Sequence, residues 1–420
     1  MFSINRLLIT FFTFFLAISN ATAFSVNYSI EGGVYNSDNI RIVETDQQED
    51  TVGILSAGLE VVGQSSTNDV SLLMNIERRE YKNDTFVDDT RGLADLKSNW
   101  GIVDKILTWT IDGFYGQARI DPYAAITPDN LQNVGYYSTG PNLNLLLTAA
   151  DIVNISAHYN GYYAEIDNTD NNSNAYSISY TRKISPVTSF SLNTDYYIVK
   201  YDDATYIDFD RFDYYLNFTR TTSISDIRIN YGTSDLEFNT GQTLEGDYKR
   251  LSSTWNLNRS NSLQFGLADE LDDGASSLNG GTVSSVIAAG SLFRNQEVTF
   301  GYLYKKDPVQ LRLAFKYADE DYLAQNDFDR KIRTGNFSAI FGQEQNVQFT
   351  LTYFYDNFDY YVLGQEDIEK TISLRLSKRI GSRFSFGLQG QRFNRESTAQ
   401  TQDVTENQIM FFMRYQSRNR

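Results

Sequence analysis

Apolar and polar residues alternate along this chain from one end to the other, and this alternation restricts the fold more than any other feature. In residues 368–380, the apolar side chains of Ile372, Leu374 and Leu376 alternate with polar ones, and a second alternating run follows the Gly-Ser pair at 381–382. A period of two is typical of a β-strand whose two faces meet different surroundings. Comparable runs recur from Leu55 onward, and no segment keeps a helical period. We therefore predict one all-β domain of roughly twenty strands, with 16 or 18 as alternatives.

The connectors between the alternating runs differ in length in a regular order. Short connectors alternate with longer ones rich in Asp and Asn. The short ones are 65–69, 149–151, 185–188, 223–226, 258–261, 306–308 and 381–382; the long ones are 37–50, 84–92, 167–174, 272–296 and 396–406. Tight turns at one end and long polar loops at the other are typical of a transmembrane antiparallel β-barrel, whereas a soluble sandwich has no reason to keep that order.

The N-terminus has the three-part layout of a secretory signal peptide. Arg6 precedes an uncharged run over residues 7–18, and Ala21-Thr22-Ala23 follows it. A membrane-anchoring helix is the alternative, but the run is shorter than the roughly 20 residues that a spanning helix needs. We expect cleavage after Ala23, with residues 1–23 as signal peptide and residues 24–420 as the barrel.

Composition excludes several classes of function. The chain carries 53 Asp and Glu against 36 Lys and Arg, a formal net charge of −17, which disfavours nucleic acid as a partner. It contains no Cys, so thiol chemistry and disulfides are excluded. The mean hydropathy of −0.40 agrees with a barrel in which every second residue faces water.

Charged residues within the alternating runs fall on the polar side of the pattern. A charge facing lipid at mid-strand would cost about 2–4 kcal/mol, so we expect these side chains to face a wet lumen. They either tune the passage of solutes or form paired struts without a transport role. The candidates are Glu60, Asp95, Lys97, Asp112, Asp195, Arg211, Asp213, Arg312, Lys316 and Arg375.

Catalytic and metal-binding motifs are weak in this sequence. His158 lies on the polar side of its run, and no GxSxG-like nucleophile motif accompanies it, so we expect a lumen or interface histidine and not an enzyme. Residues 167–174 offer several oxygens, but they lack the Gly and terminal Glu of a calcium loop. We expect a solvated loop there, with no metal and no cofactor.

Two short motifs carry a resemblance to a known family. The segment VYNSDNI, Val34 to Ile40, is similar to a Tyr-x-Asp-Asn-Ile-like stretch with one extra residue after Tyr35, and the last run, NQIMFFMRYQSRNR, alternates aromatic residues but continues five residues past Tyr415. Over residues 24–420 the chain resembles Gram-negative outer-membrane porin-type barrels associated with exopolysaccharide genes. The resemblance implies an outer-membrane location, contact with lipid and lipopolysaccharide, and insertion by the barrel-assembly machinery.

Three functions follow as alternatives from the barrel and the resemblance. The leading one is an outer-membrane channel for passive diffusion of small hydrophilic solutes, because a lumen of about twenty strands is too wide for side chains alone to fill. The others are a barrel for exopolysaccharide export or assembly, and a structural or adhesive barrel with an obstructed lumen. The solute, the open or closed state of the pore and the oligomeric state are left open.

The connector 272–296 is the predicted constriction of that lumen. Its segment SSVIAAGSLF is apolar for a surface loop, and folding into the barrel mouth would bury it. The alternative is that the same residues form an extra pair of strands. The residues expected to narrow the pore are Val286, Ile287, Leu292 and Phe293.

Overall fold

The computed structural model describes six stretches of the chain. These are residues 24–166, 169–273, 292–323, 326–343, 345–398 and 402–417. Residues 1–23 lie outside the described residues, so the signal peptide remains a prediction.

Twenty strands and two short 3-10 helices make up the described chain. In chain order they are β1 (Phe24–Ser37), β2 (Asp50–Gln64), β3 (Asn68–Tyr81), β4 (Asp89–Val103), β5 (Leu107–Arg119), η1 (Pro128–Asn130), β6 (Leu131–Leu146), β7 (Asp151–Ala164), β8 (Asn171–Ser185), β9 (Thr188–Tyr201), β10 (Phe209–Thr221), β11 (Ser225–Phe238), β12 (Thr243–Asn258), β13 (Asn261–Asp273), β14 (Leu292–Lys306), β15 (Val309–Tyr322), η3 (Asn326–Phe328), β16 (Arg330–Phe341), β17 (Val347–Tyr360), β18 (Gln365–Ile380), β19 (Phe384–Ser397) and β20 (Gln402–Gln416). No helix among the described residues is long and apolar enough to cross a membrane.

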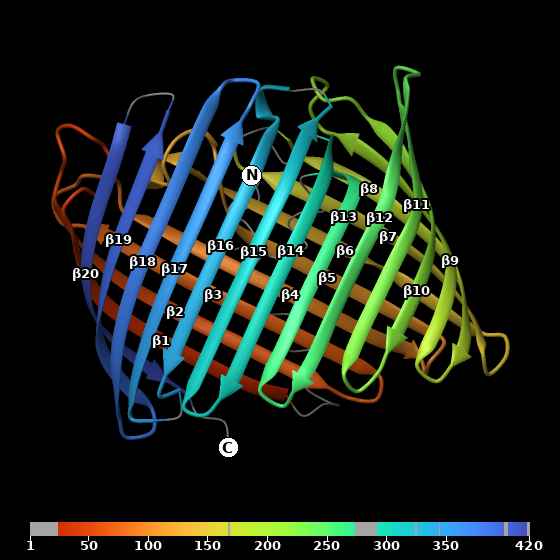
Figure 1. Cartoon of the computed structure of the whole chain (residues 1–420), viewed down its shortest axis with the longest axis horizontal. Helices are drawn as coiled ribbons and strands as arrows, with labels where there is room; N and C mark the ends of the chain where they lie inside the picture. The colour runs from red at the N-terminus through yellow and green to blue at the C-terminus, as the bar shows by residue number, and fades with distance from the viewer. Residues whose placement is uncertain are drawn as a thin grey trace.

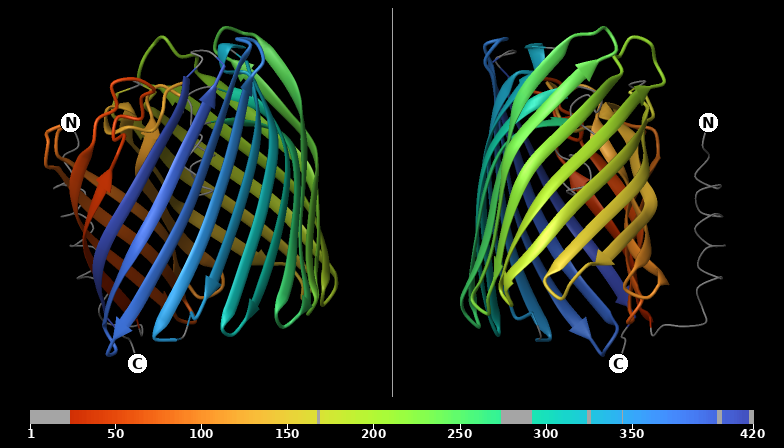
Figure 2. Two further views of the ribbon diagram at one scale, coloured as in Figure 1. Left: turned by 60° about the vertical axis from the view of Figure 1, so that its left-hand side comes forward. Right: turned by 90° about the vertical axis from the view of Figure 1, so that its right-hand side faces the viewer.

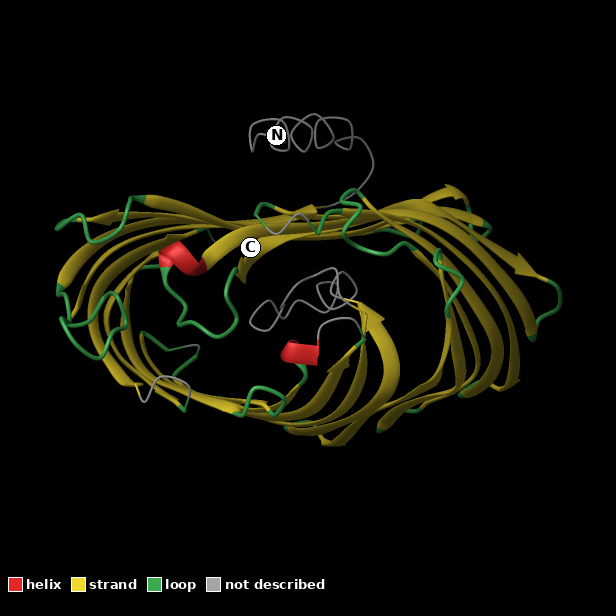
Figure 3. Cartoon of the chain, turned by 90° about the horizontal axis from the view of Figure 1, so that it is seen from above, coloured by secondary structure: helices red, strands yellow, loops and turns green. Residues whose placement is uncertain are grey.

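The strands form one closed antiparallel barrel. Each strand pairs with its neighbour in sequence, and β1 pairs with β20 from Ser29↔Gln416 to Ser37↔Gln408, which closes the ring (Figure 1). Seen from above, the wall encloses an oval space into which several loops project (Figure 3). Closure satisfies the backbone donors and acceptors that an open edge would leave unpaired. The predicted all-β barrel of roughly twenty strands is confirmed, and the alternatives of 16 and 18 are wrong.

The outer face of the barrel is a continuous apolar surface. On β18, Ile372, Leu374 and Leu376 are 44%, 47% and 48% exposed, and on β20 Ile409 and Phe411 are exposed in the same way. These strands run obliquely across the wall (Figure 2). Large apolar side chains at this density are buried in a soluble protein, and a lipid bilayer is the surrounding that favours their exposure.

The connectors divide into two sets, as expected, but their bounds differ from the predicted ones. Connectors at the lower end of Figure 1 contain two to five residues, and those at the upper end contain four to eighteen. The strands extend further than the sequence suggested: β4 begins at Asp89, β8 at Asn171 and β20 at Gln402. Polar residues there still pair in ladders, because a barrel wall continues beyond the apolar band.

Candidate functional site

The ten charged residues predicted for the lumen all lie within strands, and their position in a wet lumen remains a prediction. In the strand registers they alternate with the exposed apolar residues; Lys97, for example, is paired with Asp112, and Asp195 with Asp213. They come from seven strands on different sides of the barrel, so the structure does not bring them together into one site.

Many of these charges have partners on the wall. Arg375 forms an ion pair with Glu31 at 2.8 Å, and Lys316 forms one with Glu297 at 2.6 Å. Asn27 donates to Glu60 at 3.1 Å. Arg312 is exposed and, in the described part of the chain, forms no ion pair. The paired residues fit the role of struts, which the sequence left open beside a role in transport.

Arg211 and Asp213 form the most enclosed pair of the predicted set. Arg211 Nε lies 3.3 Å from Asp213 Oδ2, and the guanidinium lies over the Tyr197 ring at 4.4 Å. Ser234 donates to Asp213 at 2.6 Å. Arg211 also donates to the backbone carbonyl of Leu271 at 3.4 Å, although Leu271 belongs to β13, three strands away from β10.

That contact arises because the upper end of β13 separates from β12 and packs against β9, β10 and β11, while β14 stays paired with β15 up to Phe293↔Tyr322. The ladder between β12 and β13 stops at Lys249↔Asp269, whereas β13 and β14 stay paired up to Asp273↔Leu292. Leu271 and Leu292 then pack in one buried cluster with Val199, Phe209 and Leu236 from β9, β10 and β11.

The predicted connector 272–296 is therefore wrong in its bounds. Leu292 and Phe293 belong to β14 and are 7% and 5% exposed, and the connector spans residues 274–291. Leu292 and Phe293, the last two residues of the apolar segment, lengthen the hairpin because they pair with Asp273 and Asp272 of β13. Val286 and Ile287 lie outside the described residues, and a pore-narrowing role for all four residues remains a prediction.

A second segment, the connector 120–130 between β5 and β6, crosses the upper lumen to the opposite wall. We call it the cross-bridge. The side chain of Arg395 on β19 donates to the carbonyl of Tyr123, and Tyr360 on β17 donates to the carbonyl of Pro122 at 3.4 Å. At its base, Arg119 on β5 forms an ion pair with Glu369 on β18 at 2.7 Å. β5 and β17–β19 are far apart around the ring, so these contacts span the lumen.

Aromatic rings continue from the cross-bridge to the β13–β14 hairpin. Tyr123 contacts Tyr360 edge to face, with centroids 4.8 Å apart, and stacks on Phe328 at 6.1 Å. Phe328 contacts Tyr322 at 5.8 Å, and Tyr322 stacks on Phe293 at 5.0 Å. Such pairs contribute about 0.5–1.5 kcal/mol each beyond the area that they bury. The two inward segments are thus joined by one chain of packed rings.

The hydroxyl of Tyr123 helps to fix the cross-bridge. It donates to the carbonyl of Asp327 at 2.9 Å. Burial raises the pKa of Tyr123 to about 12, so the hydroxyl keeps its proton throughout the neutral range. The bridge contact consequently does not depend on pH near 7.

Paired charges surround the far end of the cross-bridge. Arg395 lies 3.3 Å from Asp367 and 3.6 Å from Glu369, which also holds Arg119. These side chains are nearly buried, and removing one partner from such a group leaves an uncompensated charge at a cost of about 3–5 kcal/mol. The cross-bridge is therefore held in place by an interlocked set of contacts and not by a single one.

Sequence reasoning missed the cross-bridge. It is shorter than the connector 274–291 and carries two Asp residues, and neither property indicates that it crosses the lumen. The available signal was proline: Pro122 and Pro128 are two of only five prolines in the chain. Proline fixes the backbone and favours an ordered connector over a mobile one.

His158 lies on the inward face of β7, where its ring Nε2 is 3.1 Å from Asn142 Oδ1. Asn142 in turn donates to Thr110 at 2.7 Å. Over the residues that the structure describes, no group of three or more His, Asp or Glu side chains is arranged to hold a metal ion. In the Asp- and Asn-rich segment 167–174, residues 167–168 lie outside the described residues.

Comparison with known proteins gives structural likeness alone. No family model matches the sequence, and no curated protein matches it. Among solved structures, OccK2 (OpdF) of Pseudomonas aeruginosa in complex with glucuronate is 9% identical, with a TM-score of 0.40 over 94% of this chain and 98% of that chain. OprD of Pseudomonas aeruginosa is 12% identical, with a TM-score of 0.34 over 94% and 95%. The FrpB iron transporter from Neisseria meningitidis is 8% identical, with a TM-score of 0.46 over 93% and 81%. Likeness at this level says nothing about the solute, and the barrel follows from the strand pairing of this chain itself.

Proposed function

We propose that this chain is an outer-membrane channel through which small hydrophilic solutes diffuse passively. The observation that carries the proposal is the division of each strand into an apolar outer face and a polar, partly charged inner face around a closed ring of twenty strands. A ring of this size leaves a lumen that side chains from the wall do not fill. The cross-bridge and the β13–β14 hairpin then set the width of the passage.

Planar-bilayer recording tests the proposal. The refolded protein is expected to give discrete conductance steps in KCl, of a size set by the space that the two inward segments leave. A protein that inserts and gives no steps would contradict the channel.

A structural barrel with an obstructed lumen is the second candidate, and the cross-bridge favours it. The contacts of Tyr123, Arg119 and Arg395 join opposite walls at the upper end. Export of an exopolysaccharide, expected from the resemblance, is the less favoured alternative, because a polymer would have to pass the same crossing. Absence of conductance in the intact protein together with conductance after removal of the cross-bridge would identify the obstructed barrel.

The membrane location makes its own prediction. Expressed in a Gram-negative host, the protein is expected to lose residues 1–23, to fractionate with the outer membrane and to run faster on unboiled gels than after boiling. The shift arises because a closed barrel resists detergent at room temperature and unfolds when heated. Recovery of the protein in the soluble periplasm would contradict the location.

A further inference from the structure

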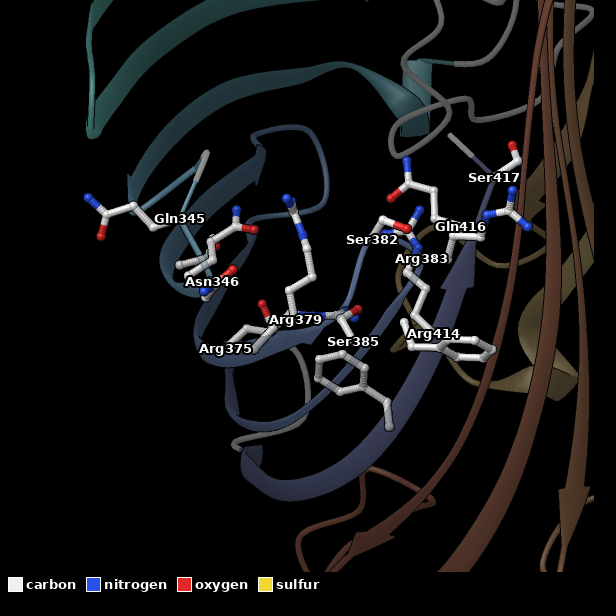
Figure 4. Close-up of a pocket in the computed structure, with 15 residues that line it drawn as sticks. Gln345, Asn346, Arg375, Arg379, Ser382, Arg383, Ser385, Arg414, Gln416 and Ser417 are labelled. Carbon is white, nitrogen blue, oxygen red and sulfur yellow. The ribbon is translucent and has the colours of Figure 1, made fainter. Parts of the chain in front are cut away.

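Four arginines surround a cavity at the lower end of the lumen, away from the cross-bridge. The cavity has a volume of about 520 Å³ and is lined by Arg375 and Arg379 of β18, Arg383 of the following turn and Arg414 of β20. Figure 4 shows their side chains around one space between adjacent strands. Uncharged polar groups, among them Gln348, complete the lining. None of the described lining residues is acidic.

Only one of these arginines is neutralised by the described residues. Arg375 forms the ion pair with Glu31. Arg383 donates to the Tyr415 hydroxyl at 3.3 Å and Arg414 to the Ser29 hydroxyl at 3.4 Å, neither of which carries a compensating charge. Arg379 is exposed to the cavity and, within the described stretches, has no carboxylate partner. Like charges held this close repel one another, and an anion between them would relieve the repulsion.

The cavity also has a fixed floor. The ring of Phe412 is 1% exposed and lies 3.6 Å beneath the guanidinium of Arg375. Gly387 permits this arrangement, because a Cβ at that position would lie 2.5 Å from the Phe412 ring. Beside it, Arg414 Nε is buried without a hydrogen-bond partner among the described atoms. The guanidinium of Arg375 is therefore held by packing in advance of any ligand.

We propose that this cavity binds a small solute that carries two or more carboxylate or phosphate groups on its passage through the lumen. Guanidinium groups present paired N–H donors that match the oxygens of both groups, and charge-assisted hydrogen bonds of this kind are stronger than neutral ones. A net-acidic chain repels anions elsewhere, so a local cationic site gives them one favourable position on the wall. The passage of this solute rests on the proposed channel function. Binding of the solute to the cavity does not itself require conduction.

The test uses the full-length refolded protein and a double variant, Arg379→Gln with Arg383→Gln. Citrate and inorganic phosphate are the two probes, and they distinguish carboxylate from phosphate recognition. In bilayers, either anion is expected to reduce the KCl current of the unmodified protein, and the reversal potential in a KCl gradient is expected to move toward cation selectivity in the variant. The matched control is Arg228→Gln with Arg312→Gln, which removes two positive charges from the inward face of other strands.

Calorimetric titration of the detergent-solubilised protein separates the site from the channel. The double variant is expected to bind the effective anion about tenfold more weakly or worse, since charge-assisted hydrogen bonds are lost, while the control retains binding. Binding that depends on Arg379 and Arg383 without any conductance would support the site and contradict the channel. Conductance with no binding of either anion, or equal binding by the variant and the unmodified protein, would overturn the site. The heat-modifiable band confirms that each variant is folded.

Discussion

Replacing Leu374 by Arg is expected to cause the largest loss of barrel assembly of any single change on β18. Leu374 is 47% exposed on the outer face, in ladder with Leu351 and Gly390. A guanidinium at this position would lie in the hydrocarbon region and cost about 2–4 kcal/mol near the midplane. The measurement is refolding into liposomes at increasing urea concentrations. The readout is the fraction of protein that shows the heat-modifiable band.

The neighbouring position provides the matched control. Arg375→Leu removes one ion pair with Glu31 but places no charge on the outer face, so assembly is expected to stay near that of the unmodified protein. The substitution also removes the contact of Arg375 with Phe412. This contact lies in the lower lumen, so the structural change is expected to stay there. Equal damage from Leu374→Arg and Arg375→Leu would show that the inward and outward faces of β18 are assigned the wrong way round.

Removal of the cross-bridge is expected to produce the largest rise in conductance. Ile120 N donates to the Asn130 carbonyl at 3.2 Å, so the β5–β6 ladder can be closed directly after this pair by an Asn-Gly turn in place of residues 121–129. The variant loses the Tyr123 contacts with Tyr360 and Phe328 and opens the space between opposite walls. Single-channel conductance is expected to increase severalfold while the heat-modifiable band is retained.

The connector 202–208 is the control for that deletion. Its backbone contacts run to its neighbours, from Asp202 N to the Asp170 carbonyl and from Asn239 N to the Asp208 carbonyl, and not across the lumen. Replacing residues 203–207 by the same turn is expected to leave conductance unchanged. An unaltered conductance in both folded variants would remove the cross-bridge from the conducting path.

The sequence by itself determined the barrel, its approximate strand number and the two faces of each strand. These properties are local: the side chains of Leu374 and Arg375 point to opposite sides of any β-strand, and a charge tolerates only the wet side. The same reasoning predicts that all ten charged candidates, including Arg211 and Asp213, face the lumen. It also separated short from long connectors, since turn residues are read from the chain directly.

Only the tertiary structure decided which inward segments meet. Arg119 and Glu369 are separated by 250 residues, and nothing in either neighbourhood specifies the other; their contact exists because ring closure sets β5 opposite β18. The separation of the upper end of β13 from β12 and the grouping of Arg375, Arg379, Arg383 and Arg414 likewise depend on the curvature of the wall. The alternation of polarity fixes on which side of a strand a residue lies, whereas its partner across a lumen depends on how the whole ring closes.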